Sequence, residues 1–379
     1  MLPTLLVAAL FAAGPVASPA GAPKMLFTAP EDAAASVRWN VLARSLVLHG
    51  RGESFQTFAG LSLGQLRAAQ AAEPERAVIE VSALLLEELF PAEKKRIEAQ
   101  REAELRRLPS AAKEVVVPTV GTQTVVTLVE PWKIVRDILR VSHRTCGSGV
   151  RHQRDPHATW TSAPGKDPIG ARFPQLCPLA LSGELPKSPQ PPLARSREFR
   201  DAMAAVANTV KNVTPEQRVA IGYWAAAPDG EQTPARWNAI ADALLIQHHT
   251  NELPAAQALE RLNAAMHDTA IACFTEKYSY MTARPTQVEL WLKPLGPVPN
   301  FPSYPSAHAC FSGAAAGILD AQFPQDAAWI DQLADESTAS RMWAGLHYSF
   351  DGSAGLSLGR EVAKQVLERK PEEAALPPQ

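Results

Sequence analysis

The sequence has almost no net charge and, after its first residues, no long hydrophobic run. Its 379 residues include 37 basic and 39 acidic side chains, a formal net charge of -2. It therefore lacks the basic surplus with which nucleic-acid-binding proteins attract phosphates. No later segment reaches the roughly 18 uninterrupted apolar residues that cross a bilayer. We expect no nucleic-acid partner and no membrane span in the mature chain.

Cysteine is also scarce. Four cysteines are too few for a disulfide framework, and their spacing matches no zinc pattern. Cys146 and Cys177 flank a Gly- and Pro-rich stretch and could pair if the protein is exported. Cys273 and Cys310 lie in apolar sequence of helical type, which is typical of buried free thiols.

The N-terminus, "MLPTLLVAALFAAGPVASPAGA", has a short apolar run followed by small residues. This pattern resembles a secretory signal, although no Lys or Arg precedes the apolar run. It predicts a signal peptide over residues 1–22 and an exported protein, periplasmic or extracellular. The alternative is the N-terminus of a cytoplasmic protein.

Apolar spacing divides the remaining chain into regions. Hydrophobic residues make up 46% of the sequence and recur mostly every three or four positions, which predicts a mainly α fold of one or two helical bundles. Residues 23–143 are expected to be helical apart from a small β-hairpin in "EVVVPTVGTQTVVTLVE", Glu114 to Glu130. Residues 144–195 form a Pro- and Gly-rich loop, either a linker or a functional cover. Residues 196–370 form a second helical domain, and residues 371–379 a tail.

The segment "NFPSYPSAHACFSG", Asn300 to Gly313, turns from a proline-rich loop into a helix. A helix start leaves backbone N–H groups unpaired, and such groups attract anions. Ser306 and His308 would then lie at the rim of an anion-binding cup.

Two further segments supply charged groups. Lys277 and Arg284 are seven residues apart, so on one continuous helix they would project from the same face. His347 and Asp351 have the i, i+4 spacing that lets a carboxylate orient an imidazole, and Arg341 could meet them at a bend near Gly345. Together these groups suit a tetrahedral or trigonal-bipyramidal oxyanion.

Written as one pattern, these residues resemble the three-part signature of the superfamily of vanadium haloperoxidases and type-2 phosphatidic acid phosphatases. The blocks are Lys277 with Arg284-Pro285, then Pro305-Ser306-x-His308, then Ser340-Arg341 with His347 and Asp351. "FPSYPSAHACFSGAAAG" and "SRMWAGLHYSFD" are more similar to fungal-type vanadium chloroperoxidases than to lipid phosphatases. The upstream segments "SVRWNVLA", "LEELFPAEK", "TPEQRVAIGYWA" and "PARWNAIADALL" resemble the soluble bacterial chloroperoxidase-like branch. The resemblance implies a mainly α bundle.

The resemblance implies a vanadium-dependent haloperoxidase, which oxidises halide with hydrogen peroxide at a bound vanadate. It makes His347 the apical vanadium ligand and His308 an acid and base, with Lys277 polarising the peroxide. The vanadate oxygens would be held by Lys277, Arg284, Ser306, the Ala307 N–H, His308 and Arg341. Asp351 would orient His347.

Two alternatives stay open. In a soluble acid phosphatase, the same cup would hold a phosphate ester without a cofactor, and His347 would form a phosphohistidine. In a non-catalytic oxyanion-binding protein, Ala307 would have blunted the chemistry, because the superfamily usually has Gly there. The resemblance also points to a halide pocket at Phe274, where chloroperoxidases often carry Trp, and at Phe301.

Overall fold

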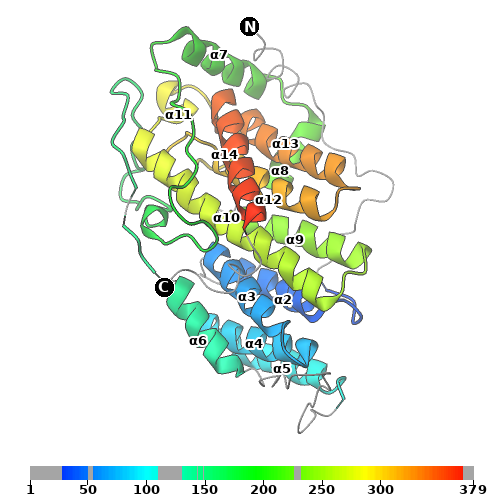
Figure 1. The fold of residues 1–379 in the computed structure, drawn as a ribbon. Coiled ribbons are helices and arrows are strands. Elements are labelled where there is room, and N and C mark those ends of the chain that lie inside the picture. The colour runs from blue at the N-terminus through cyan, green and yellow to red at the C-terminus, as the bar shows by residue number, and fades with distance from the viewer. Residues whose placement is uncertain are drawn as a thin grey trace. The chain divides into compact units, whose positions relative to one another are not determined.

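The computed structural model describes residues 28–49, 54–109, 130–142, 144–147, 149–225 and 232–369. Its chain forms two compact units. Unit 1 contains Thr145–Trp237 and Ala265–Lys370, and unit 2 contains Pro23–Arg144 and Asn238–Ala264. The described residues are mainly helical, as the sequence predicts, and contain no β-sheet (Figure 1).

Unit 2 is built from the helices of the N-terminal region together with parts of α9 and α10. Helix α3 packs against α4 and α6, and α2 packs against α3 and α4. The sequence pattern over residues 66–90 is continuous, but the chain breaks it at Pro74, which occupies the first turn of α4. The helices are α2 (Ala35–His49), α3 (Ser54–Ala68), α4 (Pro74–Leu89), α5 (Lys94–Leu105) and α6 (Pro131–Ser142), with the 3₁₀ turn η1 (Pro91–Glu93) between α4 and α5.

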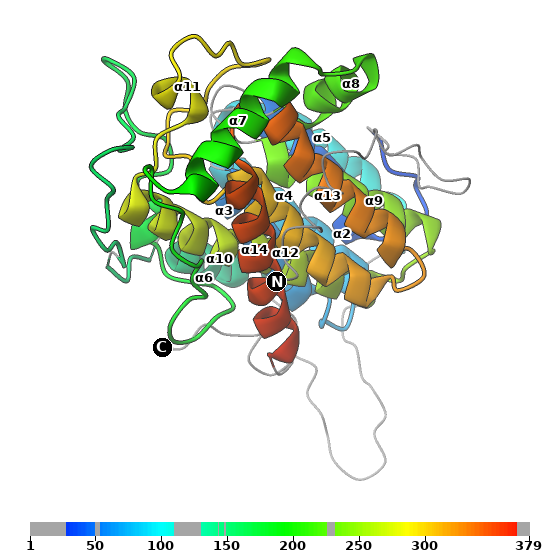
Figure 2. The same cartoon turned by 90° about the horizontal axis from the view of Figure 1, so that it is seen from above.

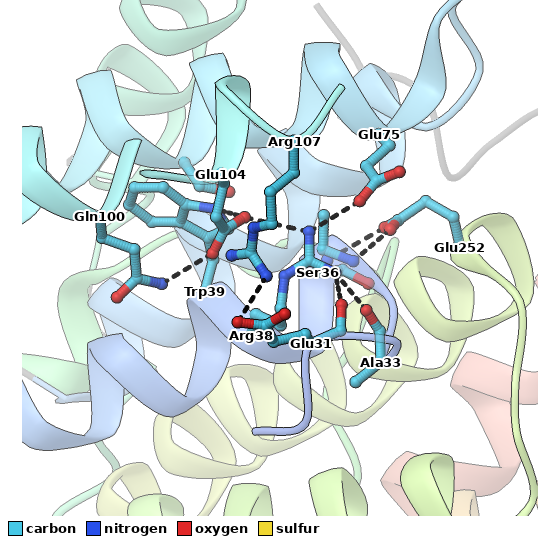
Figure 3. Close-up of polar contacts among 12 residues, drawn as sticks. Glu31, Ala33, Ser36, Arg38, Trp39, Glu75, Gln100, Glu104, Arg107 and Glu252 are labelled. Carbon is cyan, nitrogen blue, oxygen red and sulfur yellow. Dashed lines mark hydrogen bonds and ion pairs between the residues drawn. The ribbon is translucent and has the colours of Figure 1, made fainter. Parts of the chain in front are cut away.

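A partly buried ion network fixes the start of α2 (Figure 3). The Arg38 guanidinium donates to Glu75 at 2.8 Å and to Glu104 at 3.0 Å, and Glu104 also accepts from the Trp39 indole at 3.1 Å. The Glu252 carboxylate accepts from the backbone N–H groups of Ala35 and Ser36. A carboxylate at this position replaces a side-chain cap and complements the helix dipole.

Unit 1 holds the remaining helices. They are α7 (Arg197–Lys211), α8 (Pro215–Trp224), α11 (Pro285–Val288), α12 (Ala307–Gln322), α13 (Ala327–Trp343) and α14 (Ser349–Glu368), with the 3₁₀ turn η2 (Phe173–Gln175). Helices α9 (Gln232–Gln247) and α10 (Glu252–Tyr280) contribute residues to both units.

Helices α12 and α14 lie side by side in both views (Figures 1 and 2). Glycines permit this close approach. A Cβ on Gly359 of α14 would lie 2.0 Å from the Cys310 carbonyl oxygen, and one on Gly313 of α12 would lie 2.4 Å from the Leu356 carbonyl oxygen. The backbone of α12 is therefore set directly by that of α14.

The Pro- and Gly-rich segment belongs almost entirely to unit 1 and packs on the helices of that unit. Its Trp160 is buried, and the Trp160 N–H donates to the Met281 carbonyl. A disulfide joins Cys146 to Cys177, while Cys273 and Cys310 are buried free thiols. The segment is therefore packed rather than a free linker, and its role as a functional cover stays a prediction.

Some predictions fall on residues that the structure does not describe. The expected hairpin, apart from Glu130, lies outside the described residues, as do the signal peptide and the tail. Among the described residues, no helix is long and apolar enough to cross a membrane.

Candidate functional site

Lys277 lies in the last turn of α10 with its side chain fully buried. Its ammonium donates to the carbonyls of Pro302 at 2.8 Å, Ser303 at 3.0 Å and Pro305. An ammonium has three donors, so these carbonyls use all of them. Lys277 thus holds the loop that leads into α12 in place.

The sequence prediction that Lys277 and Arg284 share a helix face is wrong. Helix α10 ends at Tyr280, because Met281 adopts a left-handed conformation with φ 53°. Arg284 is the N-cap residue of α11. The two cations nevertheless meet at Phe301, since each lies 4.8 Å from the centroid of its ring.

The expected transition from loop to helix is present at Ser306. Ser306 is the N-cap residue of α12, and its hydroxyl makes no capping bond. Ala307 begins the helix, and its φ is not positive, so alanine fits here without the strain that a left-handed position would impose. One residue later, the His308 Nε2–H donates to the Trp224 carbonyl at 2.8 Å.

Arg341 reaches the same region from the end of α13, and His347 reaches it from the turn that follows. Arg341 lies in the last turn of α13, where its guanidinium donates to the Ile221 carbonyl at 2.8 Å. Gly345, with φ 75°, reverses the chain, as the expected bend requires. His347 then precedes α14, and Arg284 donates to its Nε2 at 2.8 Å.

The tautomer of His347 follows from its two neighbours. Its Nδ1 lies 2.8 Å from Asp351 Oδ2, and a carboxylate only accepts, so Nδ1 carries the proton. Nε2 therefore presents a lone pair on the side of Arg284. This tautomer is the one that a ligand to vanadium or a nucleophile toward phosphorus requires.

Burial perturbs every titratable group of the cup. It lowers the pKa of Lys277 to about 8, of Arg341 to about 9 and of Arg284 to about 10. The pKa values of His308 and His347 lie well below 6.5, chiefly through burial and then through the neighbouring cations. Both imidazoles are therefore neutral at pH 7, and both can accept a proton or a ligand.

Two buried donors of the cup, Arg284 Nη2 and Ser306 Oγ, have no hydrogen-bond partner among the described residues. The buried acceptor Asp351 Oδ1 lacks a partner there too. A buried unpaired guanidinium N–H or hydroxyl costs about 1–3 kcal/mol, and an oxyanion would satisfy both groups. The donors present therefore fit a vanadate or a phosphate.

The two residues of the expected halide pocket are brought together. The ring centroids of Phe274 and Phe301 lie 5.4 Å apart, and Phe173 of the covering segment lies 5.0 Å from Phe274. Gly170, at φ 72°, passes so close that a Cβ there would lie 2.2 Å from the Phe274 ring. The covering segment therefore seals this aromatic pair, and its use for halide stays a prediction.

Sequence reasoning missed several groups that complete the site. The Ser303 hydroxyl donates to Asp351 Oδ2 at 2.6 Å, and the Tyr348 N–H donates to the same oxygen at 3.2 Å. Backbone carbonyls at Ile221 and Trp224, near the end of α8, orient Arg341 and His308. The serine is visible in "FPSYPS", but no spacing rule links it to a carboxylate 48 residues away.

No protein-family model matches this sequence, and no curated protein sequence matches it. Solved structures do. The chain is similar to a bacterial vanadium-dependent iodoperoxidase, with a TM-score of 0.64 and 18% identity over 88% of this chain and 94% of that one. It is also similar to a bacterial vanadium-dependent chloroperoxidase in its apo form, with a TM-score of 0.59 and 11% identity over 85% and 93% of the two chains. The holo form gives a TM-score of 0.57, again at 11% identity, over 93% and 96%.

These likenesses define a fold class. The chain has the helical fold of the vanadium-dependent haloperoxidases, as the resemblance in its sequence implied.

Proposed function

We propose that this protein is a vanadate-dependent haloperoxidase that oxidises halide with hydrogen peroxide. One observation carries the proposal: the buried cations Arg284, Lys277 and Arg341 all lie near enough to His347 to lower its pKa, and Arg284 contacts its Nε2 directly. The Asp351 carboxylate accepts the proton of the other ring nitrogen, so Nε2 presents a lone pair. Such a surplus of buried positive charge requires an anion. The fold shared with haloperoxidases over nearly the whole chain supports vanadate as that anion.

Each residue has a defined part in holding the cofactor. His347 would ligate vanadium through Nε2, while Asp351 keeps the proton on Nδ1. Arg284 Nη2 and Ser306 Oγ would donate to vanadate oxygens, since both lack another partner among the described residues. The Ala307 N–H at the start of α12 and Arg341 would complete the donor set. When bound, vanadate supplies the Lewis acidity that activates peroxide.

His308 is the group that would accept and donate protons during the reaction. Its Nε2–H is bonded to the Trp224 carbonyl, so Nδ1 of the neutral ring is the basic atom. The depressed pKa keeps that atom unprotonated at pH 7 and ready to accept a proton from hydrogen peroxide. Lys277, whose donors hold the loop carbonyls, would reach the anion only by exchanging one of them.

The test is a peroxide-dependent assay of iodide, bromide and chloride oxidation before and after addition of orthovanadate. Vanadate-free protein is assayed in parallel for hydrolysis of p-nitrophenyl phosphate. We expect halide oxidation only with vanadate, and its loss by at least about a hundredfold in His347→Ala, because that variant removes the ligand. His152→Ala is the matched control, since His152 is exposed and outside the site.

The other outcomes are equally decisive. Ester hydrolysis that vanadate inhibits, without halide oxidation, would replace the proposal with a soluble acid phosphatase. Silence in both assays, together with tight vanadate binding, would make the protein a non-catalytic oxyanion binder.

A further inference from the structure

A cavity of about 580 Å³ lies in unit 1, and none of the oxyanion-site residues lines it. Its walls come from residues 153–158 and 190–195 of the covering segment. Phe199 of α7 and the residues Tyr280 and Thr282 close it from the other side. Its volume is in the range of sites for small organic molecules, roughly 300–1,000 Å³.

The two walls are tied together by one carboxylate. Asp155 accepts from the Ala194 N–H through Oδ2 at 2.7 Å and from the His157 N–H through Oδ1 at 2.9 Å. The first wall is also held to the end of α10, because the Gln153 N–H donates to Ser279 and the Ala283 N–H donates to Ala158. The cavity is therefore a defined feature of the fold.

The charge that faces the cavity is mainly positive. Arg154 and Arg195 line it together with His157, and both arginines are exposed. The carboxylate in the lining is that of Asp155, whose two oxygens already accept backbone N–H groups. Arginine presents a planar fork that matches a carboxylate, so the charged lining suits an organic acid.

The remaining lining combines the polar side chains of Gln153, Gln190 and Thr282 with apolar rings. Pro191, Pro192 and Phe199 contribute rings, and Leu193 adds an aliphatic side chain. A site with apolar rings beside two arginines selects a planar ligand with a charge at one edge. We propose that this cavity binds a small aromatic carboxylate.

Residues that line the cavity contact residues of the oxyanion site or their neighbours in the chain. The Thr282 carbonyl accepts from the N–H of Ser303, the residue whose hydroxyl holds Asp351. The ring centroids of Phe199 and Tyr348 are 4.9 Å apart, and Tyr348 follows His347 in the chain. An occupant would thus contact residues that adjoin the catalytic groups, although its binding does not depend on the proposed function.

The experiment is a calorimetric titration of benzoate into the full chain saturated with tungstate, a tetrahedral dianion that fills the oxyanion site. We expect benzoate to bind, and the double variant Arg154→Gln/Arg195→Gln to weaken binding by at least about tenfold, since each arginine bond to a carboxylate is charge-assisted. Arg218→Gln is the matched control, because Arg218 is an exposed arginine of α8 outside the cavity lining. Benzamide, which has the ring without the charge, should bind more weakly than benzoate.

Three results would overturn the proposal. They are no benzoate binding at millimolar concentration, equal affinity in the double variant and the parent, or binding that occurs only without tungstate. The last result would assign benzoate to the oxyanion site.

Discussion

At the scale of single residues, Asp351 is the group on which the chemistry of His347 depends. Burial raises the pKa of Asp351 to about 6, although hydrogen bonds from Ser303 and Tyr348 and the charges of Lys277 and Arg284 oppose the rise. Below that pH the carboxyl becomes neutral and holds the Nδ1–H of His347 less strongly. The basicity of Nε2 should therefore decrease as the pH is lowered through the region near 6.

The role of Ser303 as a positioning residue can be tested through this pKa. In Ser303→Ala the carboxylate loses a 2.6 Å charge-assisted bond, so the pKa of Asp351 should rise further. A bond of this kind is worth about 1.5 kcal/mol, roughly one pH unit. We expect the acidic limb of the pH–activity profile to shift to higher pH by roughly one pH unit.

The measurement is the rate of halide oxidation from pH 4.5 to 8.5 in vanadate-saturated protein. Ser353→Ala is the control, since Ser353 is an exposed serine of α14 that donates only to the Phe350 carbonyl. Superimposable profiles for Ser303→Ala and the parent would remove Ser303 from the site.

The residue scale also shows where prediction from sequence ends. Motif spacing predicted Lys277, Arg284, Ser306, Arg341 and His347 as site residues, because these side chains carry charge or lone pairs at fixed separations. It could not identify the carbonyls that orient them, since every residue has a carbonyl. It also gave no hint that the three Lys277 donors are used by its own loop.

At the scale of helices, the position of α12 decides the geometry of the cup. The start of this helix carries Ser306, Ala307 and His308, and its body lies against α14 through Gly313 and Gly359. A methyl group on Gly359 would lie 2.0 Å from one backbone carbonyl and 2.6 Å from a backbone nitrogen, and neither can rotate away. The helices would have to separate.

Gly359→Ala should therefore lower the free energy of unfolding by at least about 2 kcal/mol, at the upper end of overpacking costs. It should also weaken tungstate binding, because the displaced helix carries the donors. Gly222→Ala is the matched control in α8, where a Cβ would meet nothing within 4 Å. That variant should be neutral or up to about 1 kcal/mol more stable, as helix propensity predicts.

Urea unfolding and tungstate titration of both variants decide the matter. Equal stability of Gly359→Ala and the parent would mean that α12 and α14 can separate without loss of stability.

The helices themselves were predictable from the 3.6-residue apolar period, whereas the end of α10 at Tyr280 was not. Pro285 marks the latest point at which the helix can stop, and tertiary contacts of Met281 end it earlier.

At the scale of the whole chain, the long irregular segment is the feature that composition alone left open. Its many prolines and glycines suit a linker as well as a cover, since both lack apolar periodicity. Contacts between distant positions show that the segment is packed rather than a free linker: Trp160 with Met281, Tyr278 with Ile169, and Asp268 with the backbone of residues 179–181. None of these pairs follows a local rule.

The disulfide that closes this segment should contribute measurably to stability. Cys146 and Cys177 are 31 residues apart, and the entropy of closing such a loop is worth up to about 3.7 kcal/mol in the unfolded state. Engineered and native bridges often deliver less, so we expect Cys146→Ser/Cys177→Ser to lose about 2–3 kcal/mol of unfolding free energy. Neither cysteine lies in a helix, so the variant should still fold.

Thiol counting supplies the independent check. Protein purified without reductant should show no reactive thiol when folded, because Cys273 and Cys310 are fully buried and burial raises the pKa of Cys310 well above its usual value. The same protein should show two thiols in denaturant, and four only after reduction. Four thiols without reductant would contradict the disulfide, and the double-serine variant would then unfold at the same urea concentration as the parent.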